Sequence, residues 1–365
     1  MHARAGTFLK SCAHRRILSL GLPILLGLTA FPVAAQYRTE PDEVLIEEDV
    51  EQPSDTPTFA PSGALTVGDT RGWSRVAALY AQPPDLGNCI PGALRNEAKA
   101  SFLSAFNALR AIHGLRPVRY NAAADRAAGE AALMMAANEA LSHDPPPSWK
   151  CWTAEGAAAA GSSNLLGGVS SPYLAYEDDN AILAEWLIEG DGDEIGHRRW
   201  LLDPYLDETA LGRFITVLPG GVRVDSAVMK VFDFPGSSPD DSRSGGWGRS
   251  RSPATVPAFV AWPQGDYPAV FFSPRARLSF SVSEDPADMD ASGAVDFSQA
   301  TVSISDGAQM LPVRDKLWDN EGYGVANCLS WRVDGIVPGR TYAVTIAGVR
   351  GARQDRYAYS FRIMR

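Results

Sequence analysis

Between residues 96 and 188 the apolar side chains recur at the spacing of amphipathic helices. In the segment 96–112 they fall on one helical face, and a glycine and a proline follow as stop signals. The segment 122–141 is so rich in alanine that its helix can lie close to its neighbours, and the segment 179–188 opens with aspartates near its positive end. The pattern predicts three helices in this part of the chain.

Further along the chain the pattern changes to strand-like alternation. Residues 217–232 hold a Gly-Gly turn followed by alternating apolar positions, and from residue 258 onward short alternating runs are bounded by glycine, proline and aspartate. Helices followed by strands predict an α+β or three-layer first domain. The later runs predict a small all-β sandwich as the second.

Composition divides the chain into five parts. The first part has a basic start, an apolar run shorter than the roughly 20 residues that a membrane helix needs, and Ala35 at a small-residue cleavage point. We therefore expect a cleaved signal peptide rather than a retained anchor, a secreted or periplasmic location, and no membrane span in the mature chain. The parts are a signal peptide (1–35), an acidic, mostly disordered leader (36–85), the first domain (86–232), a linker (233–257) and the β-sandwich (258–365).

Charge limits the partners of the mature chain. Without residues 1–35 it carries 29 lysines and arginines against 43 acidic residues. A field of this sign repels phosphate backbones and anionic lipid headgroups. We expect no nucleic-acid partner.

The mature chain keeps three cysteines, and an oxidising compartment permits one disulfide and one leftover thiol. We expect Cys89 to pair with Cys151, because both flank one helical region while Cys328 lies far away in a strand-like run. Free buried thiols are the alternative. No C-x-x-C occurs, so a structural zinc site has no support.

Five sequence blocks follow one another in an order that resembles the CAP superfamily, the family of cysteine-rich secretory proteins, antigen 5 and pathogenesis-related 1. The likeness is to its bacterial secreted branch and covers roughly residues 88–232. The blocks are Asn107-x-x-Arg110-x-x-x-Gly114-Leu115-x-Pro117-Val118, Leu141-Ser142-His143, Gly161-Ser162-Ser163-Asn164-Leu165, Trp186-x-x-Glu189 and Gly196-His197-Arg198.

This resemblance implies an α-β-α sandwich with a cleft lined by two histidines and two acidic residues. His143 and His197 match the histidines, and Glu189 matches one acid. The second acid stands in a Gly-Glu-Asn block in the family, but this chain has Ser163 before Asn164. A neutral hydroxyl replaces a carboxylate, so a bound divalent cation such as zinc at the histidine pair should be held more weakly than in a full tetrad.

The surroundings of His197 suggest how it is oriented. We expect the acidic turn before it to form a solvated rim, Arg198 and Arg199 to pair with rim carboxylates, and residues 200–202 to enter the core. A helix cap or a buried hydrogen-bonded role is the alternative for His197. His113 stands at a helix C-terminal end, where a cation is favoured, and is expected to be structural.

Two functions of different classes remain open. The chain has neither the His-Glu-x-x-His motif of zinc proteases nor the Gly-x-Ser-x-Gly motif of serine hydrolases. Ser162 or Ser163 could imitate a nucleophile with His143 as its base, but outside any such motif. The favoured hypothesis is a non-enzymatic module that binds an extracellular or envelope ligand, a lipid or a peptide, while the β-sandwich spaces or docks it. The alternative is a metal-assisted hydrolase that uses His143, His197 and Glu189.

The second domain carries two weaker signals. Asp288, Asp290 and Asp296 follow the ligand spacing of a calcium loop, which here ends in Gln299 instead of glutamate, and an ordinary acidic hairpin loop is the alternative. Residues 335–349 resemble the late strands of fibronectin type III domains, in which the hydroxyl of a tyrosine such as Tyr342 bonds back to nearby backbone.

Overall fold

The structure, a computed structural model, describes residues 71–190, 192–232, 256–285, 290–322, 324 and 326–365. The predicted signal peptide, most of the leader and nearly all of the linker lie outside the described residues. Within the described parts, helices are followed by antiparallel sheets, which confirms the α+β fold. Among the helices found there, none has the combined length and hydrophobicity of a membrane span.

The helices predicted from the sequence form nearly as expected. Two of the three have the predicted bounds, and the alanine-rich helix begins with a 3-10 turn and is shorter at its end. The helical elements of this half are α1 (Arg71–Arg75), η1 (Val76–Leu79), α2 (Asn96–Ile112), η2 (Ala122–Ala124), α3 (Asp125–Asn138), α4 (Ala154–Ala160), α5 (Asp179–Ile188) and α6 (Gly196–Leu201).

The predicted strand segment 217–232 divides into the end of one strand, a turn and a second strand. With a third strand these form an antiparallel sheet in the order β4-β7-β6, and two short pairs, β1 with β2 and β3 with β5, lie beside it. The strands are β1 (Tyr80–Gln82), β2 (Ala93–Leu94), β3 (Arg119–Tyr120), β4 (Ser163–Ser171), β5 (Glu208–Thr209), β6 (Leu211–Val217) and β7 (Arg223–Lys230).

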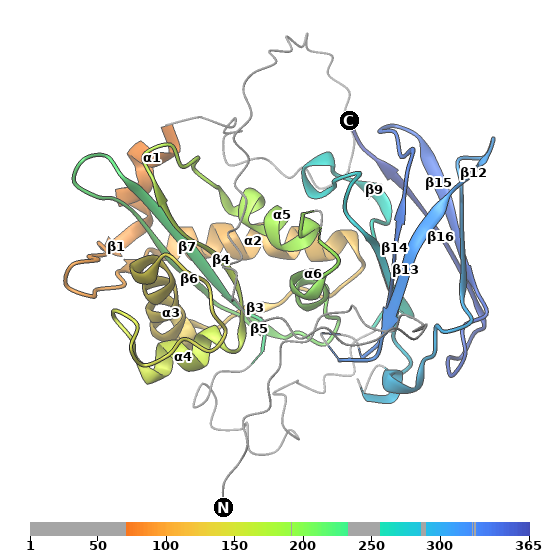
Figure 1. Cartoon of the computed structure of the whole chain (residues 1–365), viewed down its shortest axis with the longest axis horizontal. Coiled ribbons are helices and arrows are strands. Elements are labelled where there is room, and N and C mark those ends of the chain that lie inside the picture. Colours follow the sequence, from red (N-terminus) through yellow and green to blue (C-terminus); the bar gives the residue numbers. More distant parts are fainter. Residues whose placement is uncertain (1–70, 191, 233–255, 286–289, 323, 325) are drawn as a thin grey trace, which may run out of the picture.

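Helices cover both faces of this sheet. On one face α3 and α4 bury a small-residue core with Leu165, Phe214 and Val228 of the strands. On the other face α2, α5 and α6 bury Phe106, Trp186 and their neighbours against the sheet. Figure 1 shows α3 and α4 on one side of β4, β6 and β7, with α2, α5 and α6 on the other. The first domain is therefore an α-β-α sandwich.

Close contact between α3 and the sheet depends on small side chains. A β-carbon built on Gly212 of β6 would lie 2.0 Å from the carbonyl oxygen of Ala128, so the helix backbone rests directly on this strand. Alanine on the helix and glycine on the strand remove the side chains that would otherwise separate the two backbones.

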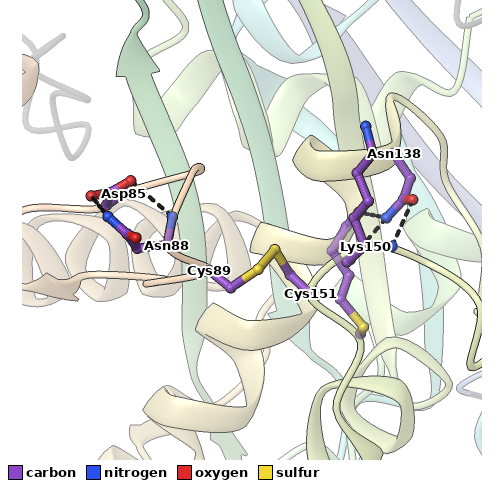
Figure 2. The surroundings of a disulfide bond; sticks show 7 residues. Asp85, Asn88, Cys89, Asn138, Lys150 and Cys151 are labelled. Atoms are coloured by element: carbon purple, nitrogen blue, oxygen red, sulfur yellow. Dashed lines mark hydrogen bonds between the residues drawn. A yellow bond between two sulfur atoms is a disulfide. The ribbon is translucent and has the colours of Figure 1, made fainter.

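The disulfide between Cys89 and Cys151 forms as predicted, and Cys328 is a buried cysteine that takes no part in it. Figure 2 shows that the bond joins the segment before α2 to the connection between α3 and α4. Asn138 lies nearby, where its side chain accepts a hydrogen bond from the backbone N–H of Lys150 (3.0 Å). The bond closes a loop across 62 residues.

The second domain consists of two facing antiparallel sheets with the orders β13-β14-β10-β8 and β12-β11-β15-β16-β9, in which only β9 is parallel to its neighbour. Side chains of both sheets share one core. The elements are β8 (Phe259–Trp262), β9 (Gly265–Tyr267), η3 (Ala269–Phe271), β10 (Leu278–Val282), η4 (Asp290–Ala294), β11 (Thr301–Ser305), β12 (Met310–Leu311), β13 (Val313–Asp319), β14 (Cys328–Val333), β15 (Thr341–Ala347) and β16 (Arg356–Ile363).

Tyr342 forms the predicted corner. Its hydroxyl accepts a hydrogen bond from the backbone N–H of Val337 (2.7 Å) and donates one to the carbonyl of Gly335 (3.2 Å). The ring is fully buried, so these bonds satisfy a hydroxyl that water cannot reach.

The two domains share one hydrophobic core. The layer of α2, α5 and α6 lies between the first sheet and the β-sandwich (Figure 1). His113 is structural, as predicted, but not as a cation. Its Nδ1 lies 2.9 Å from the carbonyl oxygen of Ala261 and its Nε2 lies 3.1 Å from the hydroxyl of Tyr267. Complete burial lowers the pKa of His113 to about 3, so the ring is neutral and joins the domains.

Candidate functional site

His143 lies in the connection that follows α3, and a backbone acceptor fixes its ring. Nδ1 is 2.8 Å from the carbonyl oxygen of Ala160, the last residue of α4. A carbonyl can only accept, so Nδ1 carries the proton and Nε2 of the neutral ring offers a lone pair. Burial lowers the pKa of His143, and the electrostatic interaction with His197 lowers it further.

His197 is held by Glu189 at the start of α6. Oε1 of Glu189 accepts the backbone N–H of His197 (2.9 Å), and Oε2 accepts that of Arg198 (3.2 Å). Nδ1 of the His197 ring lies 3.2 Å from Oε1. Glu189 is therefore an anionic cap on this helix as well as the neighbour of the imidazole. The His197 side chain remains 37% exposed, while that of Glu189 is only 8% exposed.

Strand β4 supplies the two other predicted residues. The side chain of Asn164 donates a hydrogen bond to the carbonyl of His197 (3.1 Å) and so ties the strand to α6. Ser163 stands one residue earlier, and its hydroxyl is buried without a hydrogen-bond partner among the described residues. The position that holds an acid in the resembled family is thus a buried, unsatisfied hydroxyl.

The predicted residues therefore fall into a connected group. Hydrogen bonds link Asn164, Glu189 and His197, and His143 joins them through its electrostatic interaction with His197. We refer to His143 and His197 as the histidine pair. The sequence-based site depends on the two histidines lying near each other, and the contribution of His197 to the lowered pKa of His143 is the relationship between them that the structure gives.

The residues present do not fit a zinc ion with three protein ligands. Within the described parts of the chain, no three His, Cys, Asp or Glu side chains gather in a metal-binding arrangement. The carboxylate of Glu189 is already engaged by the backbone of α6. A histidine pair without a third donor is a poor zinc site.

A serine nucleophile has no support either. The hydroxyl of Ser162 donates to the carbonyl of Ala158 (2.9 Å), and Nδ1 of His143 is bound to backbone. Neither Ser162 nor Ser163 has a hydrogen bond to His143 among those described, so the pair of nucleophile and base is not assembled.

The predicted calcium loop stays a prediction. Asp288 lies outside the described residues, and of Asp290 only the backbone is described, at the start of η4. The carboxylate of Asp296 accepts hydrogen bonds from the backbone N–H (2.7 Å) and the hydroxyl (2.9 Å) of Ser298, which is a common turn arrangement.

The expectation that Arg198 and Arg199 pair with carboxylates of the solvated rim is wrong. Both are buried, Arg198 against the ring of Trp262 and Arg199 with Asp319 (3.0 Å), and both of these partners belong to the β-sandwich. The sequence reasoning also missed Arg277 of the second domain, which binds Asp193 of the acidic turn. An apolar run directly after the two arginines was the available signal that this segment is enclosed.

A separate groove of about 920 Å³ lies beside the disulfide. Its wall is largely apolar, with prolines 83, 84 and 219 and both disulfide cysteines. None of the predicted site residues other than these cysteines lines it. Asp85, Lys150 and Thr216 are polar residues of its lining, and its size alone does not make it the functional site.

Comparison with known proteins identifies the first domain. Residues 103–213 match the sequence model of the CAP family, the Cysteine-rich secretory protein family. This segment contains most of the site, and the first domain therefore contains a CAP domain over residues 103–213. The family describes secreted-type modules, in keeping with the disulfide. No curated protein and no solved structure matches the chain.

Proposed function

We propose that the chain is an exported binding module whose CAP domain takes up an extracellular or envelope ligand, a lipid or a peptide, at a cleft bordered by the histidine pair. The observation that carries this proposal is that both rings are fixed by neighbouring acceptors, Nδ1 of His143 by the carbonyl of Ala160 (2.8 Å) and Nδ1 of His197 by Glu189 (3.2 Å). His143 and His197 are the binding residues, and Glu189, Asn164 and Ser163 form their support.

The chemistry of the rings suggests what they bind. A neutral imidazole whose Nδ1–H is already bound presents Nε2 as an acceptor. Such a group suits a ligand with O–H or N–H donors, such as a hydroxylated lipid headgroup or a peptide backbone. The half-exposed ring of His197 can receive this ligand without rearrangement of α6.

The test measures binding of two probes, vesicles of phosphatidylcholine and phosphatidylethanolamine, and a random peptide library. His143→Ala and His197→Ala should each lower the affinity for the bound probe at least about tenfold, the effect of losing one hydrogen bond of about 1.4 kcal/mol. Tyr173→Ala is the matched control, since Tyr173 is 89% exposed and outside the site. Binding that all three variants retain would overturn the proposal.

The hydrolase alternative is tested with zinc. Wild type should bind zinc weakly, and Ser163→Glu, which supplies the missing carboxylate, should bind it about tenfold or more tightly, whereas Ser163→Ala should not. Micromolar zinc binding by the wild-type chain that needs His143, together with turnover of a peptide or an ester, would replace the binding module with an enzyme.

Export is part of the same proposal. Residues 1–35 are proposed to direct the chain across the membrane and to be removed after Ala35. The amino-terminal sequence of protein recovered from periplasm or medium should begin at Gln36. An intact amino terminus in a membrane fraction would mean that the segment is a retained anchor.

A further inference from the structure

The turn between Glu189 and His197 is held by the β-sandwich. The carboxylate of Asp193 accepts a hydrogen bond from Nη1 of Arg277 (3.0 Å) and lies 3.3 Å from Nη2 of Arg332. The same Nη2 of Arg332 donates to the carbonyl of Gly192 (2.8 Å). Arg277 and Arg332 of the β-sandwich therefore hold the acidic turn of the first domain in place.

The helix that follows the turn is fastened to the same sheet. The guanidinium of Arg198 donates to the carbonyls of Leu187 (2.6 Å) and Arg277 (2.6 Å) and lies over the ring of Trp262. Buried guanidinium groups need all their acceptors, because an unsatisfied donor in the interior costs more than a single hydrogen bond contributes. The residue next to His197 is thus fixed by both domains.

Arg277 takes part both in the contacts of the acidic turn and in the contacts of Arg198. Its side chain is 1% exposed and binds Asp193, the hydroxyl of Ser330 (3.1 Å) and the carbonyl of Asp315, while its own carbonyl accepts from Arg198. One buried residue of the sandwich consequently sets both the turn before His197 and the residue after it.

We infer that the β-sandwich positions His197, with Asp193 and Arg277 as positioning residues that keep α6 and its ring in place. The second domain is then neither a spacer nor an independent docking unit. The consequence for ligand binding rests on the proposed function of the histidine pair, but the positioning itself does not.

Hydrogen exchange at the backbone amides of His197 and Arg198 reports this directly, because both amides donate to Glu189. In the full chain, Asp193→Ala should lower their protection roughly tenfold and should shift the Hε1 resonance of the His197 ring. The amide of Val228, in the middle of β7, should keep its protection. No ligand is present, so failure here is separate from failure of the proposed function.

Glu194→Ala is the matched control, since Glu194 is an exposed acid of the same turn with no described contact to the sandwich. It should leave both the exchange and the resonance unchanged. Equal loss of protection at His197 and Val228 in Asp193→Ala would indicate general destabilisation and overturn the inference. Unchanged amide protection and an unchanged ring resonance of His197 in Asp193→Ala would also overturn the inference.

Arg332→Ala tests the link from the β-sandwich and should lower the exchange protection of the His197 and Arg198 amides. Arg314→Ala removes an arginine of the same sheet that pairs with Asp334 instead, and should not. In the double variant Asp193→Ala/Arg332→Ala the losses should be less than the product of the single effects. Independent effects at the two positions would contradict a shared link.

Discussion

The guanidinium carbon of Arg198 lies 3.8 Å from the ring centroid of Trp262, so the residue after His197 stacks on a tryptophan of the β-sandwich. A desolvated cation on an aromatic face stabilises by about 2 kcal/mol, and the buried ring adds its hydrophobic burial. This contact joins the CAP domain and the sandwich at the candidate site.

Trp262→Ala should lower the free energy of unfolding by about 3–5 kcal/mol, because it leaves a cavity and an exposed guanidinium face. Urea denaturation followed by circular dichroism measures this. Trp318→Ala, at a partly exposed tryptophan of β13, should cost less than about 1 kcal/mol. Equal losses in the two variants would mean that the Arg198–Trp262 stack contributes little.

Replacing Cys89 by serine should lower the free energy of unfolding by about 4 kcal/mol, since the bond closes a loop across 62 residues in the unfolded chain. Denaturation with and without a reductant measures it in the wild type. Cys328→Ala should leave the difference between oxidised and reduced protein unchanged, because the disulfide joins Cys89 to Cys151 and does not include Cys328. If the stability difference between oxidised and reduced protein disappeared in Cys328→Ala, Cys328 would be part of the disulfide and the assigned Cys89–Cys151 pairing would be wrong.

Stability should fall in acid through His113. Its pKa is about 3 in the folded chain and 6.5 without the fold, so between these values the unfolded chain binds a proton that the folded chain does not. The contribution of the neutral ring is complete above pH 6.5 and is lost as the pH falls toward 3, about 3 kcal/mol by pH 4.

Unfolding free energies of wild type and His113→Gln from pH 7 to pH 4 measure this contribution, because glutamine does not titrate. The gap between the two proteins should narrow steadily below pH 6.5. Glu177, whose pKa burial raises to about 8, titrates in the same range but contributes equally to both proteins. A constant gap would show that His113 is accessible to protons in the folded chain.

Removal of two different buried tyrosine hydroxyls in the sandwich should have opposite effects on the free energy of unfolding. Tyr342→Phe leaves the N–H of Val337 and the carbonyl of Gly335 without their partner and should cost about 1–2 kcal/mol. Tyr359→Phe removes a buried hydroxyl that has no hydrogen-bond partner among the described residues, and should be neutral or stabilising. Thermal unfolding of the two variants gives the comparison, and a larger loss from Tyr359→Phe would contradict it.

The elements that depend on local pattern could be predicted from the sequence. The helices at 96–112 and 179–188 have their predicted bounds, because their apolar spacing and stop signals lie within the segments themselves. The corner at Tyr342 was equally local. The segment 217–232 was less clear, because alternation does not show where one strand ends and the next begins.

What the sequence could not supply is which charges are buried between the domains. Arg198 and Arg199 follow an acidic turn and so were expected to pair with its carboxylates, but their acceptors in the sandwich and the ring of Trp262 come from segments more than sixty residues away. The dual use of Glu189, as helix cap and as neighbour of His197, was also missed, although Glu189 lies only eight residues before His197. The sequence shows that Arg198 and Arg199 are hydrogen-bond donors, but only the fold shows which distant residues accept from them.

The shared layer of α2, α5 and α6 limits how this chain can be engineered. A fragment that ends at residue 232 would delete both hydrogen-bond partners of His113 and the Arg277 carbonyl that accepts from Arg198, and would uncover an apolar surface beside them. Such a fragment should aggregate on expression. Transfer of this CAP domain to another protein therefore requires the β-sandwich to be carried with it.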